Sequence, residues 1–431
     1  MVDPLPSTSS VLRPSRRTLL RGGVALVASP GLLSAGPAIH VNRRPKLRVL
    51  GTHVTLQPAI RERAQRVLDI DIEFLPGGSA EVLQKASTFP ESFDVYEQWS
   101  NSIEILWEAG AIQPIQHERI ALWNEVNDLC KTGRLEAGAT VGKGAAPHRM
   151  LYAQANGTLS GAPSQELSFL PYVHNVDSFG YDAASVERGT PYGSESWGWL
   201  LDPRWRGHVG IVNEPTIGLF DLALAAEARG LVTFADIGQM TRKEIDMLFE
   251  VLIDHKRRGQ FGAFWNSVPH SVDLMASGRI CVSSMFSPAV SALNGQGHDV
   301  VYAAPREGYR AWHGVMCLSS RTSGHAMDAA YRYMNWWLSG WPGAFVARQG
   351  YYISNPERAR AFLSEAEWAY WYSGLEATSP LTGPDGSVSV RAGEVRRGGS
   401  YRERFGHVSV WNTVMREYEY SMRGWYSLLT A

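Results

Sequence analysis

The stretch Ser194 to Ala225, SESWGWLLDPRWRGHVGIVNEPTIGLFDLALA, holds a short apolar turn, a strand and the start of a helix in immediate succession. Its apolar run Val209 to Val212 is typical of a buried strand. The polar residues that follow can cap a helix, and Pro215 suits a first helical turn, before an apolar face that includes Leu219 and Leu222. A strand ending at a helix N-terminus is where α/β folds place ligands, although an ordinary strand-loop-helix connection has the same pattern.

The composition and charge of the 431-residue chain limit its class. Hydrophobic residues make up 44% and charged residues 19%, so the chain can bury a large core, and its length predicts two lobes. The 41 basic and 42 acidic residues nearly cancel, which leaves no basic field for nucleic acid. The 15 Trp and 17 Tyr residues exceed the usual needs of a core and favour an aromatic-lined site or a large interface.

The first residues have the features of an export signal. Ser15 to Arg21, SRRTLLR, matches the twin-arginine pattern, and Gly22 to Leu33 is a mildly apolar run too short to span a bilayer. Small residues follow at Ala35 and Ala38, so we expect residues 1–38 to form a twin-arginine signal peptide. Its removal takes away four arginines and one aspartate and leaves a net charge of −4. The predicted location is therefore the periplasm.

The chain after this signal begins with a β-α-β-α-β pattern. Apolar or alternating runs predict strands over Lys46–Gly51, Asp69–Leu75 and Phe93–Tyr96, with helical spacing between them. Short helical crossovers imply a mostly parallel sheet that is covered on both faces. The loops at residues 52–54 and 97–100 then follow two strand ends, where a ligand can be reached.

Two lobes follow from the order of these elements. We predict that residues 46–170 and 305–431 form the first lobe, the latter ending in a helical extension, and that residues 171–304 form the second. An extended segment near residues 167–181 is the candidate for the first crossing between lobes, and Trp312 to Ser319 is the return strand. The predicted fold class is α/β, with a mostly parallel, helix-flanked sheet in each lobe and hinge crossings between them.

The C-terminal part is predicted to be mainly helical. Helical runs are expected over Glu365–Tyr372 and Val408–Leu429. Between them, the Gly/Arg/Ser-rich segment Ser379–Ser400 is predicted to be a mobile loop.

The chain lacks the common catalytic motifs. It has no HExxH zinc-protease motif, no GxSxG nucleophile elbow and no Walker loop, and its histidines and carboxylates are scattered. Cys130, Cys281 and Cys317 have no metal-binding spacing and are predicted to be inert buried thiols. We therefore expect a protein that is not an enzyme and needs no cofactor or metal.

Several stretches resemble signatures of the periplasmic solute-binding proteins of ABC transporters, in the branch that includes the spermidine/putrescine-binding proteins. The opening stretch carries the second-lobe pattern SW..L.DP.W.G.VG, followed by a short polar loop and an apolar helix. The further resemblances are SFDVY at 92–96, LMASGRI at 274–280, YAAPREG at 302–308, a helix with Tyr331, Met334, Asn335 and Trp336, and GYYISNP at 350–356. Their order and spacing cover most of the chain from Lys46 to Pro356.

The resemblance implies a type II periplasmic binding protein fold, in which two lobes close on a solute. It also implies a small-molecule ligand, delivery to an ABC permease in the inner membrane, no nucleic acid and a monomer. Carried over by position, the implied ligand-binding residues are Thr52, His53, Trp99, Ser100, Glu214, Thr216, Trp265, Phe286, Trp312, His313, Gln349 and Tyr351.

Aromatic walls suit a cationic or flat apolar solute. The sequence departs from the polyamine-binding pattern, because Gly314, Pro215 and Gly218 stand where carboxylates are expected and only Glu214 and Glu97 remain. A polyamine-like compound therefore competes with a monocation, an opine-like amino compound or a neutral aromatic solute. The alternatives are a metal or anion binder on the same fold and a periplasmic enzyme on a related scaffold.

Overall fold

The computed structural model describes residues 44–431, and the predicted signal peptide lies outside them. The strand and helix predicted within Ser194–Ala225 are both present. Its apolar run is the fully buried strand β11 (Val209–Val212), and helix α5 (Pro215–Ala228) begins three residues later. Glu214 caps this helix, because its side chain accepts a hydrogen bond from the Thr216 backbone N–H.

The first half of the main sheet is built from the β-α-β-α-β pattern. Strand β1 pairs in parallel with β2 on one side and β3 on the other. The strands are β1 (Lys46–Gly51), β2 (Asp71–Pro76) and β3 (Val95–Trp99), and the helices nearest to them are α1 (Pro58–Leu68), α2 (Ser79–Thr88), α3 (Ile103–Glu108), α9 (Gly324–Trp337) and α10 (Trp341–Ala347). Their apolar side chains form one continuous core.

The excursion after this half carries short elements. They are β4 (Ile112–Gln113), β5 (Ile115–Gln116), α4 (Asp128–Thr132), β6 (Lys143–Gly144), β7 (Tyr152–Ala153), β8 (Leu159–Ser160) and β9 (Glu166–Leu167). Four of them, β5, β9, β7 and β8, make a small separate sheet.

The second half of the main sheet repeats the parallel arrangement, with β11 between two partners. Its elements are β11, β12 (Phe261–Trp265), β13 (Val282–Met285), β14 (Val300–Tyr302), α5, α6 (Arg242–Arg257), α7 (Val268–Ala276) and α8 (Ser287–Gly295). Two apolar clusters form the core of this half, one between α5 and α6 and one between α7 and α8.

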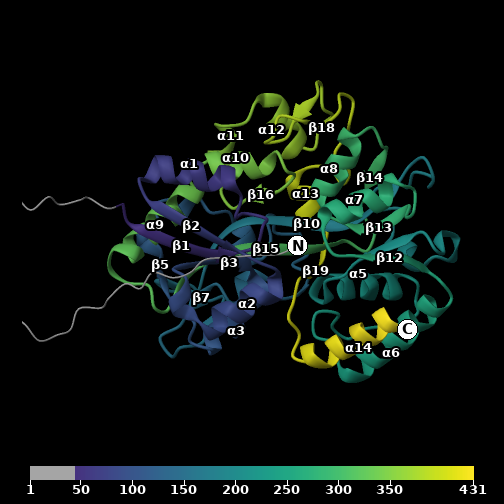
Figure 1. Ribbon diagram of the computed structural model, residues 1–431, viewed down its shortest axis with the longest axis horizontal. Coiled ribbons are helices and arrows are strands. Elements are labelled where there is room, and N and C mark those ends of the chain that lie inside the picture. The colour runs from purple at the N-terminus through teal and green to yellow at the C-terminus, as the bar shows by residue number, and fades with distance from the viewer. Residues whose placement is uncertain (1–43) are drawn as a thin grey trace, which may run out of the picture. The chain divides into compact units, whose positions relative to one another are not determined.

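Two long antiparallel strands connect the halves. They are β10 (Leu170–Asp182) and β15 (Tyr309–Ser319), and nearly every residue of both is buried. The sheet order β12-β11-β13-β10-β15-β3-β1-β2 places them in its middle, and Figure 1 shows them between β1, β2 and β3 on one side and β12 and β13 on the other. Residues 170–177 of β10 pair with β15, whereas its last residues pair with β13 and β14. One strand thus belongs to both halves.

A buried ion-pair network joins these strands to the second half. The Arg310 guanidinium of β15 donates Nε–H to Asp221 of α5 at 2.7 Å and lies 3.4 Å from an Asp177 oxygen of β10. It also bonds Asn412 at 3.0 Å. Burial raises the pKa of Asp177 to about 6, although the Arg310 charge opposes this rise. The three side chains are almost fully buried, so each charge depends on its partners.

Replacing Arg310 with methionine should therefore destabilise the protein strongly. Arg310→Met leaves two buried carboxylates without their cation, and the free energy of unfolding should fall by about 3–5 kcal/mol at neutral pH. Chemical denaturation measures this change. The exposed Arg306→Met is the matched control and should cost less than about 1 kcal/mol. Equal stability of Arg310→Met and the wild type would contradict this role.

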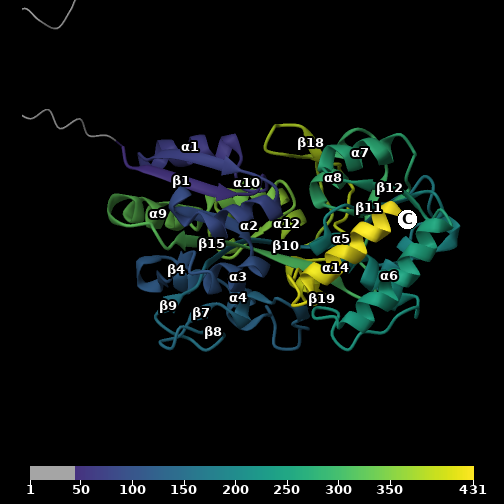
Figure 2. The ribbon, with the colours of Figure 1, turned by 60° about the horizontal axis from the view of Figure 1, so that its bottom comes forward.

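The C-terminal segment differs from its prediction. Val408–Trp411 was expected to be helical but forms strand β19, which pairs in parallel with β15. Its alternation V-S-V-W, with β-branched residues two apart, is a strand pattern. Only Tyr418–Thr430 forms a helix, α14, and Figure 2 shows it beside α5 and α6 of the second half. Trp425 and Leu428 of α14 join the second-half core.

The segment predicted as a mobile loop carries regular structure. It contains the two-stranded sheet of β17 (Leu381–Thr382) and β18 (Val388–Val390), and β18 packs against α8. The remaining elements of this region are β16 (Tyr352–Ile353), α11 (Pro356–Arg360), α12 (Glu365–Trp371) and α13 (Tyr401–Phe405).

The described residues contain no candidate membrane-spanning helix, no metal-binding cluster and no disulfide. Between residues 44 and 431, no helix combines the length and the apolarity that crossing a bilayer requires. Over the same residues no cluster of His, Cys, Asp or Glu side chains is arranged to hold a metal ion. The cysteines form no disulfide there; Cys130 and Cys317 are buried as predicted, whereas Cys281 is half-buried.

Candidate functional site

Three aromatic side chains from separate parts of the chain form a row beside the sheet centre. Trp99 ends β3, Trp312 lies on β15, and Tyr351 precedes β16. The Trp99 and Trp312 rings are 4.7 Å apart at their centroids, edge to face, and Trp312 meets Tyr351 in the same way at 5.5 Å. We call these three residues the aromatic row.

A cavity of about 900 Å³ lies at the Tyr351 end of the row. Its walls come from the loop after β1, the turn after α10, helices α7 and α8, and the β17–β18 hairpin. The lining residues that matter below are His53, Gln57, Pro288, Gln349, Tyr351 and Asp385. Gln57 and Gln349 hydrogen-bond each other at 3.0 Å or less, which fixes one wall.

A smaller cavity of about 200 Å³ lies at the Trp99 end of the row. It is enclosed by α2 and the end of β3 from the first half, by the start of α5 from the second half, and by Tyr418 of α14. Glu214 is the only charged side chain among its lining residues. One Glu214 oxygen accepts from the Thr216 N–H at 2.9 Å and from the Thr216 hydroxyl at 2.5 Å, so the carboxylate is held in place.

The other carboxylate noted in the sequence, Glu97, lines neither cavity. It is fully buried in β3, where Thr55 donates a hydrogen bond at 2.7 Å and Tyr172 donates one at 3.1 Å to the same oxygen. Burial raises the pKa of Glu97 to about 7, because water no longer stabilises its charge. Glu97 is therefore a core group whose carboxyl is protonated at mildly acidic pH and loses its proton as the pH rises through about 7.

The structure places the predicted site residues in three groups. The residues that line one of the two cavities are His53, Trp99, Glu214, Thr216, Gln349 and Tyr351. Trp312 lies between them within the aromatic row, and Thr52 is buried beside His53. Phe286 caps α8 and packs edge to face on Trp265 at 5.4 Å.

The third group lies away from both cavities. His313 follows Trp312 on β15 and therefore points to the opposite face, where it stacks on His174 with centroids 4.6 Å apart. Burial lowers the pKa of His313 to about 4, so it is neutral. Trp265 belongs to the second-half core, and Ser100 bonds a backbone carbonyl.

Several lining residues were not predicted from the sequence. Gln57, Pro288 and Asp385 were not singled out, nor was Tyr418, which reaches the smaller cavity from the C-terminal helix. Pro288 lies two residues after Phe286, which the resemblance had marked, and its position was a usable signal. Tyr418 and Asp385 depend on how the C-terminal segment folds back, which no local pattern reveals.

The chain belongs to the family of bacterial extracellular solute-binding proteins, whose model matches residues 59–371. The predicted resemblance is thereby confirmed. No curated protein sequence matches the chain.

Several solved structures with the same fold share little sequence identity with this chain. The TpPotD lipoprotein of Treponema pallidum is 12% identical, with a TM-score of 0.61 over 89% of this chain and 99% of that one. A spermidine/putrescine ABC transporter substrate-binding protein from Streptococcus pneumoniae is 12% identical, with a TM-score of 0.58 over 90% and 98% of the two chains. The binding protein AgtB of A. tumefaciens, solved with agropinic acid, is also 12% identical, with a TM-score of 0.54 over 90% and 99%. These matches confirm the type II α/β fold.

The buried Glu97 predicts a pH dependence of stability. Its pKa is about 7 in the folded protein and about 4.3 in an unfolded chain, so its contribution is present below the unfolded value and is lost as the pH rises through 7. Between pH 5 and 8, the wild type should lose up to about 3 kcal/mol of unfolding free energy relative to Glu97→Gln. Denaturation curves at both pH values measure this difference. The exposed Glu104→Gln should follow the wild type, and parallel pH profiles for wild type and Glu97→Gln would show the assignment to be wrong.

Proposed function

We propose that this protein is the periplasmic substrate-binding component of an ABC importer and that it captures a small amine-containing solute at the aromatic row. Membership of the extracellular solute-binding family supports the general role. Export by the twin-arginine route, a monomeric state and delivery to an inner-membrane permease belong to the same proposal. The proposed class of solute rests on the aromatic row, which has a cavity and a carboxylate at each end.

The charges around the row favour a cation. Glu214 is unopposed in the smaller cavity, and Asp385 lines the larger one at its exposed rim. The one arginine of the larger cavity, Arg348, is already paired with Glu367 at 2.5 Å. An ammonium group beside Trp99 would gain a cation–π attraction of about 0.5–2 kcal/mol and the Glu214 charge together.

The solute that fits best carries a polar oxygen as well as an amine. The indole N–H of Trp99 is buried without an acceptor among residues 44–431, so an oxygen on the solute can satisfy it. The carboxylates are few compared with the charges of a polyamine, and a polycation would leave ammonium groups unpaired at a cost of several kcal/mol each. The proposal therefore ranks a compound with one or two amines above spermidine.

Shortening the aromatic row should weaken solute binding without unfolding the protein. Trp99→Ala and Trp312→Ala each remove one ring of the row, and each should lower the affinity for the bound amine at least about fivefold, which is about 1 kcal/mol. Calorimetric titration of the mature protein with putrescine, spermidine and choline measures this loss. Trp107→Ala removes a half-buried indole outside both cavities and is the control. Wild-type affinity in both row variants would overturn the cleft assignment.

Removing the charge of Glu214 should separate cationic from neutral ligands. Glu214→Gln keeps an oxygen that can accept from the Thr216 N–H, so the cap of α5 is retained. Its affinity for an amine should fall about tenfold or more, because a charge-assisted contact is lost, while that for an uncharged analogue stays the same. The same calorimetric titration compares the two. Equal loss for both ligands would point to a structural effect, and no loss for either would contradict the role of Glu214.

A further inference from the structure

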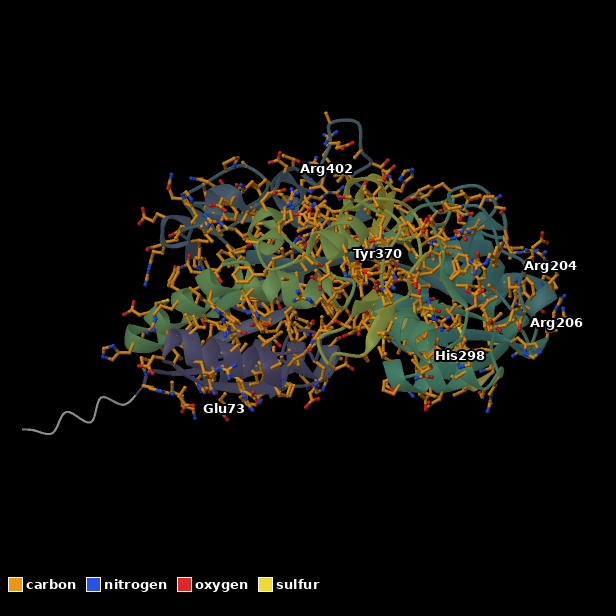
Figure 3. All side chains as sticks on the ribbon, turned by 90° about the horizontal axis from the view of Figure 1, so that it is seen from above. Glu73, Arg204, Arg206, His298, Tyr370 and Arg402 are labelled. Atoms are coloured by element: carbon orange, nitrogen blue, oxygen red, sulfur yellow. The ribbon has the colours of Figure 1, made fainter. Side chains whose placement is uncertain are left out.

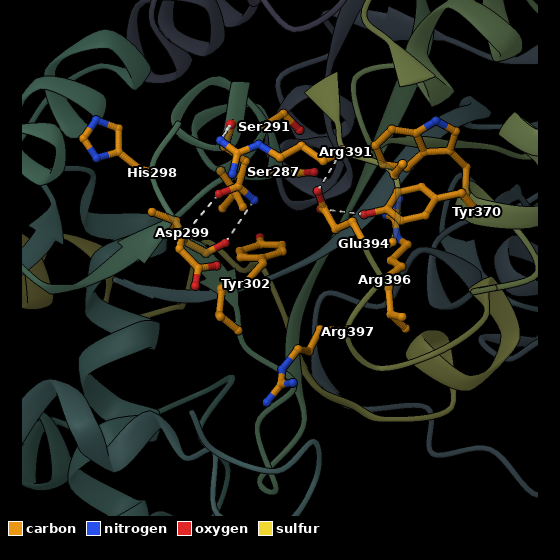
Figure 4. Close-up of a pocket in the computed structure, with 18 of the residues that line it drawn as sticks. Ser287, Ser291, His298, Asp299, Tyr302, Tyr370, Arg391, Glu394, Arg396 and Arg397 are labelled. Atoms are coloured by element: carbon orange, nitrogen blue, oxygen red, sulfur yellow. Dashed lines mark hydrogen bonds between the residues drawn. The ribbon is translucent and has the colours of Figure 1, made fainter. Parts of the chain in front are cut away.

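A third cavity, of about 440 Å³, lies between α8 and β14 on one side and the segment 391–404 on the other. Figure 4 shows Arg391, Arg396 and Arg397 around it, together with Ser287 and Ser291 of α8. The charged side chains that line it are Arg188, Arg391, Arg396, Arg397, Arg404, Asp299 and Glu394. Arginines outnumber carboxylates among these lining residues.

Three of the arginines are already engaged. Arg188 forms two contacts of 2.5 and 2.6 Å with Asp299, and Arg397 is paired with Glu195 at 2.6 Å. Arg391 bonds the backbone carbonyl of Asn294.

Arg396 is a buried charge without a carboxylate partner. Only 7% of this residue is exposed, and within residues 44–431 no carboxylate lies within ion-pair distance of it. Its Nη2 donates to the Gly350 carbonyl at 3.1 Å, while its Nη1 has no partner there. The guanidinium lies over Trp371 at 4.7 Å and Tyr352 at 5.0 Å from their ring centroids. Burial and the nearby charge of Arg404 lower the pKa of Arg396 from its ordinary value.

Arg404 adds a second buried charge of the same kind. It is 1% exposed, its Nη1 donates to the Arg397 carbonyl at 2.6 Å, and its Nε has no partner among the described residues. It too makes no ion pair within that part of the chain. Two guanidiniums that line the same cavity are thus buried without a carboxylate partner among the described residues, and such a charge is unfavourable unless an anion compensates it.

We propose that this cavity binds a small oxyanion, a carboxylate or phosphate group, with Arg396 as the main recognition residue. A guanidinium binds such groups through two parallel N–H bonds, and Arg396 has an unused N–H on a lining side chain. Helix α8 begins at Ser287 on the cavity wall, so the positive end of its dipole reinforces the site.

The anion site is distinct from the aromatic row. Helix α8 presents Ser287, Val290 and Asn294 to the arginine cavity and Pro288 and Ala292 to the larger cavity beside Tyr351, while Ser291 lies at the boundary and lines both. The two sites therefore share a helix but differ in charge. Arg396 and Arg404 give the arginine cavity two buried charges without carboxylate partners among the described residues, whereas the one arginine of the larger cavity, Arg348, is paired with Glu367.

The site is also tied to the contact between the two halves of the sheet. Gly350, whose carbonyl accepts from Arg396, has a φ of 86°, and any side chain there would collide with Ser287 of α8. Glycine is required at such a position. Arg396 thus contacts Gly350, where the turn after α10 packs against α8. An oxyanion bound at Arg396 lies beside this contact.

Titration with inorganic phosphate and, separately, with citrate and acetate in chloride-containing HEPES buffer tests this proposal. Calorimetry and melting temperature should both respond to at least one of these anions at millimolar concentration, and the stronger response tells phosphate from carboxylate. Arg396→Gln should weaken that binding at least about tenfold. The exposed Arg402→Gln, on α13 in the same segment and labelled in Figure 3, should bind like the wild type.

Two results would overturn the proposal: a wild type that responds to none of the anions, or Arg396→Gln that binds as tightly as the wild type. If circular dichroism shows that Arg396→Gln does not fold, Arg396→Lys replaces it. That variant keeps the positive charge but cannot donate two parallel N–H bonds, so it should bind the anion more weakly than the wild type. Trp312→Ala should keep the full anion response. A failure of the amine proposal is thereby distinguished from a failure of this one.

Discussion

The buried guanidinium of Arg310 is the constraint on which the arrangement of the two halves depends. It lies on β15, and its partners Asp177 and Asp221 lie on the other connecting strand and on a helix of the second half. Because side chains alternate along a strand, Arg310 and Trp312 share one face of β15. Burial raises the pKa of Tyr351 at the end of the aromatic row, and the nearby negative charge of Asp177 raises it further. The charges that join the halves therefore lie directly beside the proposed solute site.

The two proposed sites use the same scaffold with opposite electrostatics. The aromatic row has Glu214 at one end and few competing cations, so it suits a positively charged amine. In the arginine cavity, Arg396 and Arg404 are buried without a carboxylate partner among the described residues, so the cavity suits an anion. Helix α8 lies between the arginine cavity and the larger cavity of the aromatic row. Each site binds unfavourably a solute that carries the charge preferred by the other site.

The sequence predicted those parts of the structure whose patterns are local. The run Val209–Val212 with its capped helix was predicted because apolar run, cap and proline are adjacent in the chain, and the family resemblance indicated Trp99 and Trp312. Val408–Trp411 was predicted as helix because its four residues were merged with the true helix after them. The arginine cavity could not be predicted, because Arg396 becomes buried only where segment 391–404 packs on α8. Long-range packing of this kind leaves no periodic signal in one sequence.

The most direct test is a thermal-shift screen of the mature protein in phosphate-free buffer against mono-, di- and polyamines, quaternary amines, amino acids, opines, sugars and metal ions. A ligand that binds only the folded state raises the melting temperature, by an amount that grows with its concentration relative to the dissociation constant. The account predicts a rise with a small amine and a weaker rise with its uncharged analogue. A rise with sugars or metal ions alone, or no rise with any amine, would contradict it.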